Sequence, residues 1–362
     1  MTDKRTIIFT GAIIGILAAY LIHLGNPGNM GICVACFIRD IAGGMGLHRA
    51  EVVQNIRPEI IGFIFGALII SLLNKEFKSR GGSSPFVRFI IGMFVMIGAL
   101  VFLGCPLRMV LRLSGGDLTA IAGFLGFASG IIIGTQFIKK GFSLGKAHDQ
   151  NPINGYILPV IAIILLSLRI LNPEFIFLSE SGPGSAFAPI IIALIAGLIV
   201  GVLSQKSRIC MVGGIRDIYL IKDPHLFNGF IAIFVFGLIF NFAFGNFNLG
   251  FEGQIAAHND FIWNFLGMLL AGFGSVLLGG CPLRQTILAG EGNTDSAVTF
   301  LGLLVGGAIS HNFGLAGAPS GVGTNAKVAV IIGIIMVTLI GSLNIYFNSI
   351  KYSQKGEISH GA

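Results

Sequence analysis

Long apolar runs separated by short polar connections dominate the pattern along the chain. The hydrocarbon core of a bilayer is about 30 Å thick, and a helix of roughly 20 apolar residues crosses it. Ten runs approach that length, so the pattern predicts about ten transmembrane helices and an all-α polytopic membrane protein. The runs lie at residues 7–24, 58–74, 86–104, 118–138, 155–172, 187–204, 225–245, 261–280, 295–313 and 327–348.

Glycines recur inside these runs at a spacing of four residues. The 362-residue chain contains 53 glycines, and residues four apart lie on one face of a helix. Helices in lipid associate through small residues that let backbones approach, so these faces predict close helix contacts. General glycine richness of membrane helices explains any single pair equally well. The sets are Gly11/Gly15, Gly62/Gly66, Gly126/Gly130/Gly134, Gly197/Gly201 and Gly302/Gly306.

Charged residues are scarce and scattered. They make up 11% of the chain, against about 25% in soluble domains, which excludes an ordinary soluble protein. The net charge of +7 does not indicate a nucleic-acid site, because the basic residues lie at the ends of apolar runs rather than in one cluster.

The basic residues predict an orientation in the membrane. When the ten runs alternate in direction, sixteen of the 23 Lys and Arg residues fall on the side of the N-terminus. Cytoplasmic loops carry the excess of Lys and Arg, so both termini are expected in the cytoplasm and the protein in the inner (cytoplasmic) membrane. No small-residue cleavage site follows the first run, and we expect that run to remain in the mature protein.

Two motifs occur twice at nearly the same separation. Residues 32–41, ICVACFIRDI, align with 209–218, ICMVGGIRDI, at an offset of 177. The pentapeptide GCPLR stands at 104–108 and again at 280–284, an offset of 176. A shared offset indicates a duplication. We therefore divide the chain into a first membrane repeat, 1–172, and a second, 173–362.

The number of crossings in each repeat determines how the two copies are related. Five crossings per repeat invert the second copy relative to the first. Transporters built from inverted repeats hold their substrate near the bilayer midplane. If one of the ten runs is only an interfacial helix, the repeats are parallel and this argument weakens.

Both repeats carry polar motifs between apolar flanks. Non-helical backbone survives at membrane depth only where protein or a cavity covers it, and charges there indicate a functional site. We therefore expect re-entrant cysteine-bearing loops that meet near the midplane. The first motif supplies Cys33, Arg39 and Asp40 and their equivalents Cys210, Arg216 and Asp217; the second supplies Cys105 with Arg108 and Cys281 with Arg284.

The GCPLR motif predicts the beginning of a short helix. Proline is favoured at the first helical position, where its missing N–H costs nothing. The preceding Gly-Cys pair then lies at a helix N-terminus, where free N–H groups and the positive end of the helix dipole favour an anion. The arginine adds positive charge one turn later. The residues concerned are Gly104, Cys105, Pro106 and Arg108, with Gly280, Cys281, Pro282 and Arg284.

The cysteines suggest the kind of anion. A thiol is a weak hydrogen-bond donor but a soft group that suits a sulfur or selenium terminus. The sequence therefore predicts a pathway lined by cysteines, with the arginines and aspartates as its field and support. The alternatives are that the cysteines pack as small hydrophobic residues and that Asp40 and Asp217 form structural ion pairs. The pathway cysteines are Cys33, Cys105, Cys210 and Cys281, with Cys36 as an additional member.

Cys36 departs from the duplication, because Gly213 stands at the equivalent position. With Cys33 it forms a C-x-x-C pair, a spacing compatible with redox chemistry or metal binding. No second such pair exists and the seven histidines are dispersed, so we expect no metal and no cofactor. The chain lacks a P-loop and a nucleophile elbow, and we do not expect an enzyme.

The duplicated motifs and the span pattern resemble the YeeE/YedE sulfur-transport family over nearly the whole chain. The lone Cys33–Cys36 pair and the chain length are more similar to the YedE branch, associated with selenium metabolism, than to the thiosulfate-importing YeeE branch. The resemblance implies import of a thiosulfate-like or selenium-containing anion, passed between thiols without large domain motion. Cys33, Cys105 and Cys281 match the family's functional cysteines best.

The resemblance also implies partners. Such transporters often work beside a small cytoplasmic sulfur carrier of the TusA type, so the expected partners are a small chalcogen-containing anion, a TusA-like protein and the lipid bilayer, with no nucleic acid. The residues leave two other functions open: a membrane thiol-disulfide enzyme that uses Cys33 and Cys36, and a membrane scaffold for a cytoplasmic sulfur or selenium carrier.

Overall fold

The computed structural model describes residues 3–359, and the side chains of residues 3–350. Lys351 and Lys355, which contribute to the predicted orientation, lie outside the described side chains. The helices are α1 Lys4–His23, α2 Val34–Gly44, α3 Pro58–Leu73, α4 Pro85–Val101, α5 Pro106–Ser114, α6 Ala120–Lys139, α7 Pro152–Leu171, α8 Gly182–Ser185, α9 Ile190–Ser207, α10 Met211–Ile221, α11 His225–Ala243, α12 Phe261–Leu278, α13 Pro282–Gly290, α14 Thr294–Asn312 and α15 Thr324–Ser359. A 3₁₀ turn, η1, covers Glu51–Val53, and strands β1 (Arg80–Gly81) and β2 (His148–Asp149) pair antiparallel.

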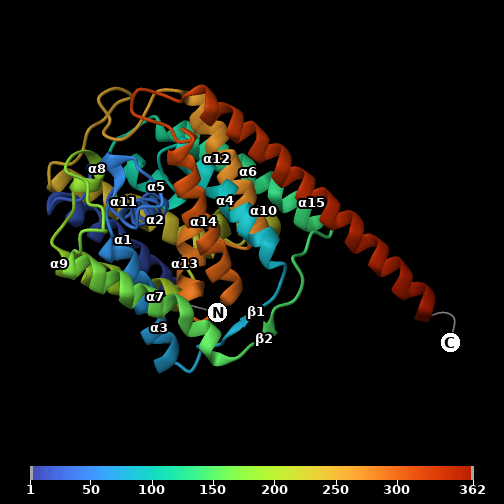
Figure 1. The fold of residues 1–362 in the computed structure, drawn as a ribbon. Helices are drawn as coiled ribbons and strands as arrows, with labels where there is room; N and C mark the ends of the chain where they lie inside the picture. Colours follow the sequence, from blue (N-terminus) through green and yellow to red (C-terminus); the bar gives the residue numbers. More distant parts are fainter. Residues whose placement is uncertain (1–2, 360–362) are drawn as a thin grey trace.

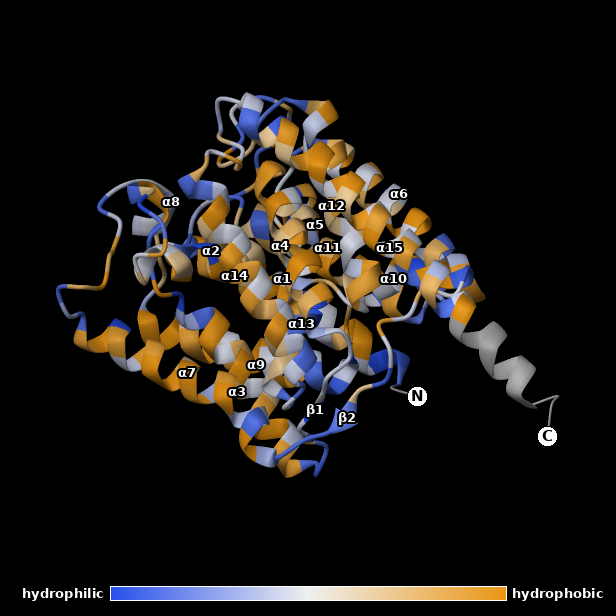
Figure 2. Ribbon diagram, turned by 45° about the vertical axis from the view of Figure 1, so that its right-hand side comes forward, coloured by the Kyte–Doolittle hydropathy of each residue, from blue (hydrophilic) through white to orange (hydrophobic). Residues whose placement is uncertain are grey.

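The fold is that of an all-α multi-pass membrane protein. Within the described residues, nine helical segments are long and apolar enough to span a membrane. Figure 2 shows the apolar residues along these helices and the hydrophilic residues in the connections at their ends. The predicted run 295–313 forms helix α14, which is not among the nine. Its polar residues, including buried Asp295, Thr299 and Ser310, make it less apolar than those nine segments.

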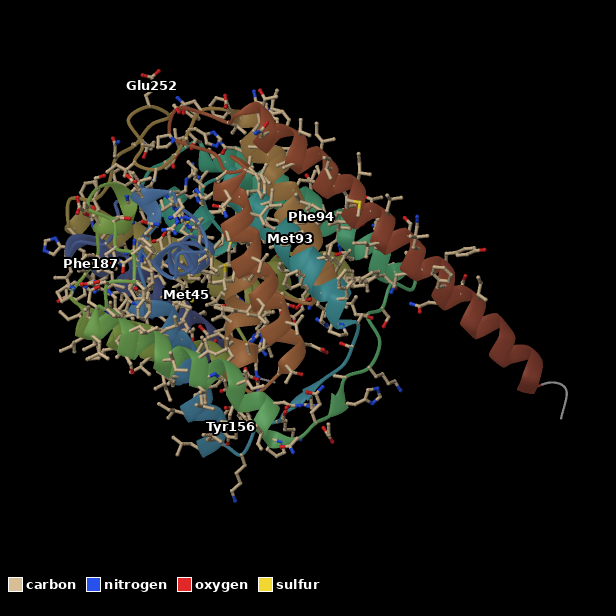
Figure 3. The ribbon with its side chains drawn as sticks, viewed as in Figure 1. Met45, Met93, Phe94, Tyr156, Phe187 and Glu252 are labelled. Atoms are coloured by element: carbon tan, nitrogen blue, oxygen red, sulfur yellow. The ribbon has the colours of Figure 1, made fainter. Side chains whose placement is uncertain are left out.

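The connections form two opposite faces of the molecule. One, the N-terminal face, carries the β1–β2 pair and the start of α7; Figure 3 shows Tyr156 at that end and Glu252 at the other. The opposite face, here called the far face, is closed by contacts between distant loops. Asn29 donates to the carbonyl of Ile255 and Asn312 to that of Leu47. Helix α14 begins beside β1 and ends at this far-face contact, so it crosses the whole molecule.

The predicted glycine faces form the closest helix contacts. A Cβ at Gly62 of α3 would lie 2.6 Å from the carbonyl oxygen of Leu194, and one at Gly201 of α9 would lie 2.6 Å from that of Phe63. Only glycine lets these backbones approach so closely. The other sets make the same kind of contact between α1 and α11, α6 and α12, and α4 and α14. The expectation drawn from the glycine spacing is confirmed.

Each of these four contacts joins a helix from one half of the chain to a helix from the other half. Helices α1, α3, α4 and α6 come from residues 1–172, and each packs on a helix from residues 173–362, respectively α11, α9, α14 and α12. In Figure 1, the red-orange α14 accordingly lies beside the cyan α4, and the orange α12 beside the green α6. The two halves are therefore interlocked.

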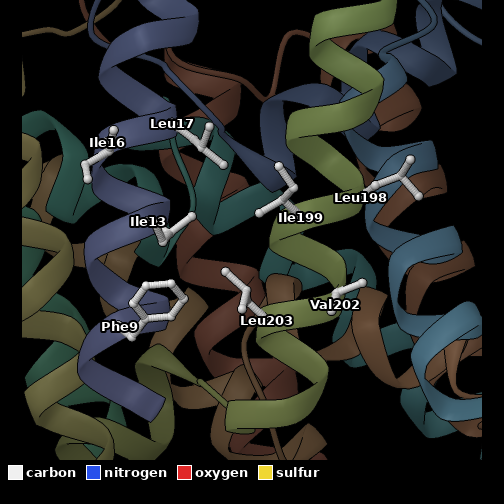
Figure 4. Close-up of a pocket in the computed structure, with 8 residues that line it drawn as sticks. All are labelled: Phe9, Ile13, Ile16, Leu17, Leu198, Ile199, Val202 and Leu203. Carbon is white, nitrogen blue, oxygen red and sulfur yellow. The ribbon is translucent and has the colours of Figure 1, made fainter. Parts of the chain in front are cut away.

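One consequence of the glycine contacts is a groove on the surface. Helix α1 turns its glycines toward α11, and α9 turns its glycines toward α3, so the bulky faces of α1 and α9 border a space of about 450 Å³. Figure 4 shows the groove, including Phe9, Leu17, Ile199 and Leu203. Every residue that lines it is apolar. The groove therefore has no polar or charged side chain that could bind an anion.

Candidate functional site

Three thiols from the first half lie together at two helix N-termini. Helix α2 begins at Val34 with Cys33 as its N-cap, and α5 begins at Pro106 with Cys105 as its N-cap. The Sγ of Cys33 lies 2.7 Å from that of Cys36 and 4.0 Å from that of Cys105. All three side chains are buried. We call them the three-thiol cluster.

Two thiols from the second half repeat the arrangement. Helix α10 begins at Met211 after Cys210, and α13 begins at Pro282 after Cys281. The two Sγ atoms are 3.9 Å apart, and both side chains are buried. We call them the two-thiol cluster. In both halves the duplication therefore brings the cysteine of the first motif against the cysteine of the second.

Each cluster combines two helix N-termini rather than one. The proline of GCPLR predicts the helices that begin at Pro106 and Pro282, with Gly104 and Gly280 just before the N-cap cysteines. The first motif also begins a helix directly after its cysteine, which the sequence did not signal. Because two positive helix ends converge on each pair of thiols, the clusters favour a negatively charged group.

Arg108 lies beside the three-thiol cluster and is fully buried. Its Nη1 donates to the Cys36 Sγ at 3.4 Å and to the Leu103 carbonyl. Its Nε and Nη2 donate to the carbonyls of Asn29 and Ala256, both at 3.0 Å. Among the described residues no carboxylate pairs with this guanidinium. A buried positive charge next to the thiols is therefore left without a counterion.

Arg39 and Asp40 form an ion pair, as the structural alternative for Asp40 predicts, and a third residue joins them. Asp40 accepts from Arg39 Nη2 at 2.6 Å and from Arg57 Nε at 2.7 Å, and Asp40 and Arg57 are fully buried. Arg57 also donates to the carbonyls of Pro183 and Ala186. The sequence analysis missed Arg57, because it belongs to no repeated motif. Two guanidinium groups sharing one carboxylate leave a surplus positive charge.

The equivalent charges of the second half are more exposed and differently paired. Arg216 bonds Asp217 at 2.8 Å, but their side chains are 29% and 20% exposed. Arg284 pairs with Glu291 at 3.3 Å. Arg208 bridges Glu291 and Glu76, both at 2.8 Å. Unlike Arg108, Arg284 therefore has an acidic partner.

The fold and the buried thiols define a class: a multi-pass α-helical membrane protein with two groups of cysteines at paired helix N-termini. Residues 206–357, which include Cys210, the second GCPLR and Cys281, match the Sulphur transport family. The match covers the second half of the chain, from the end of α9 into α15, and therefore the whole two-thiol cluster.

Two curated relatives are similar to parts of the chain. The thiosulfate transporter TsuA of Escherichia coli strain K12 is 28% identical over 132 residues, 35% of each chain. The thiosulfate transporter TsuA of Spirochaeta thermophila is 32% identical over 112 residues, 30% of this chain and 33% of the relative. The aligned regions span about a third of the length of these relatives.

Proposed function

We propose that this protein carries a small sulfur- or selenium-containing anion, such as thiosulfate, across the membrane through its two thiol clusters. The observation that carries the proposal is the convergence of two helix N-termini on buried thiols, once in each half. The names of the two TsuA relatives support thiosulfate as the cargo. The lone Cys33–Cys36 pair keeps a selenium analogue as an alternative cargo.

The physical basis is that charged groups and helix ends stabilise the negative charge of the anion, while the thiols bind its soft sulfur or selenium atom. Moving an anion out of water costs several kcal/mol or more, and the helix ends and buried arginines offset part of that cost. The thiols donate weak S–H bonds, so they hold the soft end of the anion without trapping it. Passage from Cys36 and Cys105 to Cys210 and Cys281 would follow as a series of such exchanges.

We further propose that residues 1–172 and 173–362 are inverted repeats, with both termini in the cytoplasm and the three-thiol cluster reached from outside. The matching order of helices in both halves and the excess of basic residues near the N-terminal face support this arrangement. A membrane-impermeant label on single-cysteine variants in intact cells tests it. Reaction at an introduced cysteine at position 149 but not at 252 would contradict it.

Uptake of radiolabelled thiosulfate tests the transport function. We expect Cys105→Ala and Cys281→Ala each to reduce uptake at least tenfold, because each removes a donor at a helix N-terminus, while the purified variants elute as the wild type does. Cys→Ser at the same positions keeps a hydrogen-bond donor of similar size but removes the soft sulfur atom. It therefore shows whether uptake needs only the donor or the sulfur itself. Full uptake by both alanine variants would refute the pathway.

A second candidate function, a thiol-disulfide enzyme, is favoured by one observation, the 2.7 Å between the Cys33 and Cys36 Sγ atoms. The two functions differ in what they require of Cys36. If Cys36→Ser, which keeps a hydrogen-bond donor but cannot form a disulfide, retains thiosulfate uptake, disulfide chemistry is not needed for transport. A TusA-like carrier at the N-terminal face remains the partner we expect for released sulfur, and co-purification with the full-length protein tests it.

A further inference from the structure

A cavity of about 420 Å³ opens on the far face above the three-thiol cluster. Loops that are distant in the sequence border it, and its lining includes Met30, Leu103, Arg108, Arg39, Ser310 and His311. Leu103 and Arg108 connect the cavity to the cluster, because the Leu103 carbonyl lies 3.9 Å from the Cys36 Sγ and Arg108 donates to the same sulfur. These two residues therefore border the cavity and also contact the three-thiol cluster.

Arg39 gives the cavity a guanidinium with donor capacity to spare. Its Nε and Nη2 both bond one oxygen of Asp40, and among the described residues its Nη1 has no hydrogen-bond partner. The side chain is 4% exposed and borders the cavity. With Arg57 sharing the same carboxylate and Arg108 lacking one, the wall of the cavity carries net positive charge.

His311 adds a second unused polar group. It lies at the end of α14, and its buried Nε2 has no hydrogen-bond partner among the described residues. Buried polar atoms in proteins are nearly always bonded, so this nitrogen, beside the cavity, is free to bind a ligand. The ring is held in place by His48, whose centroid lies 4.8 Å away.

His48, by contrast, is fully used. Burial lowers its pKa, so the ring is neutral. Its Nε2–H donates to the Arg39 carbonyl at 3.1 Å, and its Nδ1 accepts from the Ala50 N–H at 3.3 Å. His48 therefore bonds the backbone of Arg39 and packs against the His311 ring, and it has no donor left for a ligand.

We propose that this cavity is an entry site that orients the transported anion. Arg39 and the Nε2–H of His311 bind the oxygen-rich end of a sulfur oxyanion, and the terminal sulfur points past Leu103 and Arg108 toward Cys36. The proposal rests on the transport function and adds selectivity to it: N–H groups recognise the oxyanion, and only an ion with a soft terminal atom continues to the thiols. Sulfate would bind at the entrance but would not pass.

The test is the concentration dependence of thiosulfate uptake in proteoliposomes that contain the full-length protein. We expect His311→Leu to raise KM about tenfold with little change in kcat, because a hydrogen bond to an anion is lost before the thiols are reached. His311→Gln keeps an N–H donor and should recover most of the affinity. His23→Leu, an exposed histidine on the same face outside the cavity, should behave as the wild type.

A second variant and a competitor complete the test. Ala316 lines the cavity, and Ala316→Trp should fill it and reduce uptake without touching His311. Excess sulfate should inhibit uptake by the wild type and inhibit the His311→Leu variant less. A wild-type KM in both His311→Leu and Ala316→Trp overturns the entry site but leaves transport standing. Absence of thiosulfate uptake by the wild type overturns both.

Discussion

At the scale of single residues, the most consequential contact is the shared carboxylate of Asp40. Its two oxygens pair with Arg39 and Arg57, and its side chain is fully buried. Removing one partner from such a group leaves buried charge uncompensated, which typically costs about 3–5 kcal/mol. We therefore expect Asp40→Asn to lower the stability of the purified protein strongly, as measured by thermal unfolding in detergent.

Asp217→Asn is the matched control for this prediction. It changes the equivalent residue of the second half, whose ion pair with Arg216 is partly exposed. Partly exposed pairs contribute about 1 kcal/mol or less, so this variant should melt close to the wild type. Equal losses in the two variants would show that burial does not set the difference.

The sequence predicted the residues that its repeated motifs contain and missed those outside them. The duplication alone marked Cys33, Cys105, Cys210 and Cys281, with the arginines and aspartates of the same motifs, as candidate site residues. Arg57 and His311 belong to no repeated motif. Their partners, Asp40 and His48, lie 17 and 263 residues away in the chain. No local pattern carries such pairings, because they depend on how the loops of the far face meet.

At the scale of helices, the glycine contacts lead to a prediction. A Cβ at Gly66 would collide with the backbone of Leu198, so α3 and α9 would have to move apart. We expect Gly66→Ala to destabilise the protein by about 1–3 kcal/mol, seen as a lower melting temperature and less monodisperse protein on gel filtration.

Gly323→Ala is its control, because the space around Gly323 is open. The same methyl group there should have little effect on melting or elution. If both substitutions were equally harmless, close backbone approach would not be what these glycines provide.

Helix boundaries were predictable where a residue has a strong positional preference. Proline at the first helical position predicted α5 and α13. The start of α2 and α10 after a cysteine was not predicted, because cysteine is not among the residues that typically cap a helix. Helix α14 was found from its length, but its polar residues belong to internal contacts that hydropathy cannot express.

At the scale of the whole molecule, the sequence predicted two repeats but not that the helices of one repeat pack against those of the other. Each of the four helix contacts made by the repeated glycines joins one half to the other, and a duplication alone does not say which helices meet. We expect residues 1–172 expressed alone to be degraded or aggregated, since the contact faces of α1, α3, α4 and α6 would be bare.

Coexpression of residues 1–172 with residues 173–362 should restore a complex that co-purifies and takes up thiosulfate. The full chain cut by a protease site introduced at Glu180, in the loop between the halves, serves as the control. A stable, monodisperse first half on its own would contradict the interlocked arrangement.

The packing of each half against the other also has a consequence for the origin of the gene. A half-length ancestor with these glycine faces could bury them only against a second copy of itself, so it would have worked as a homodimer before duplication. Fusion then freed the two copies to diverge, which accounts for Cys36 in one half where Gly213 stands in the other, and for the acidic partner that Arg284 has and Arg108 lacks.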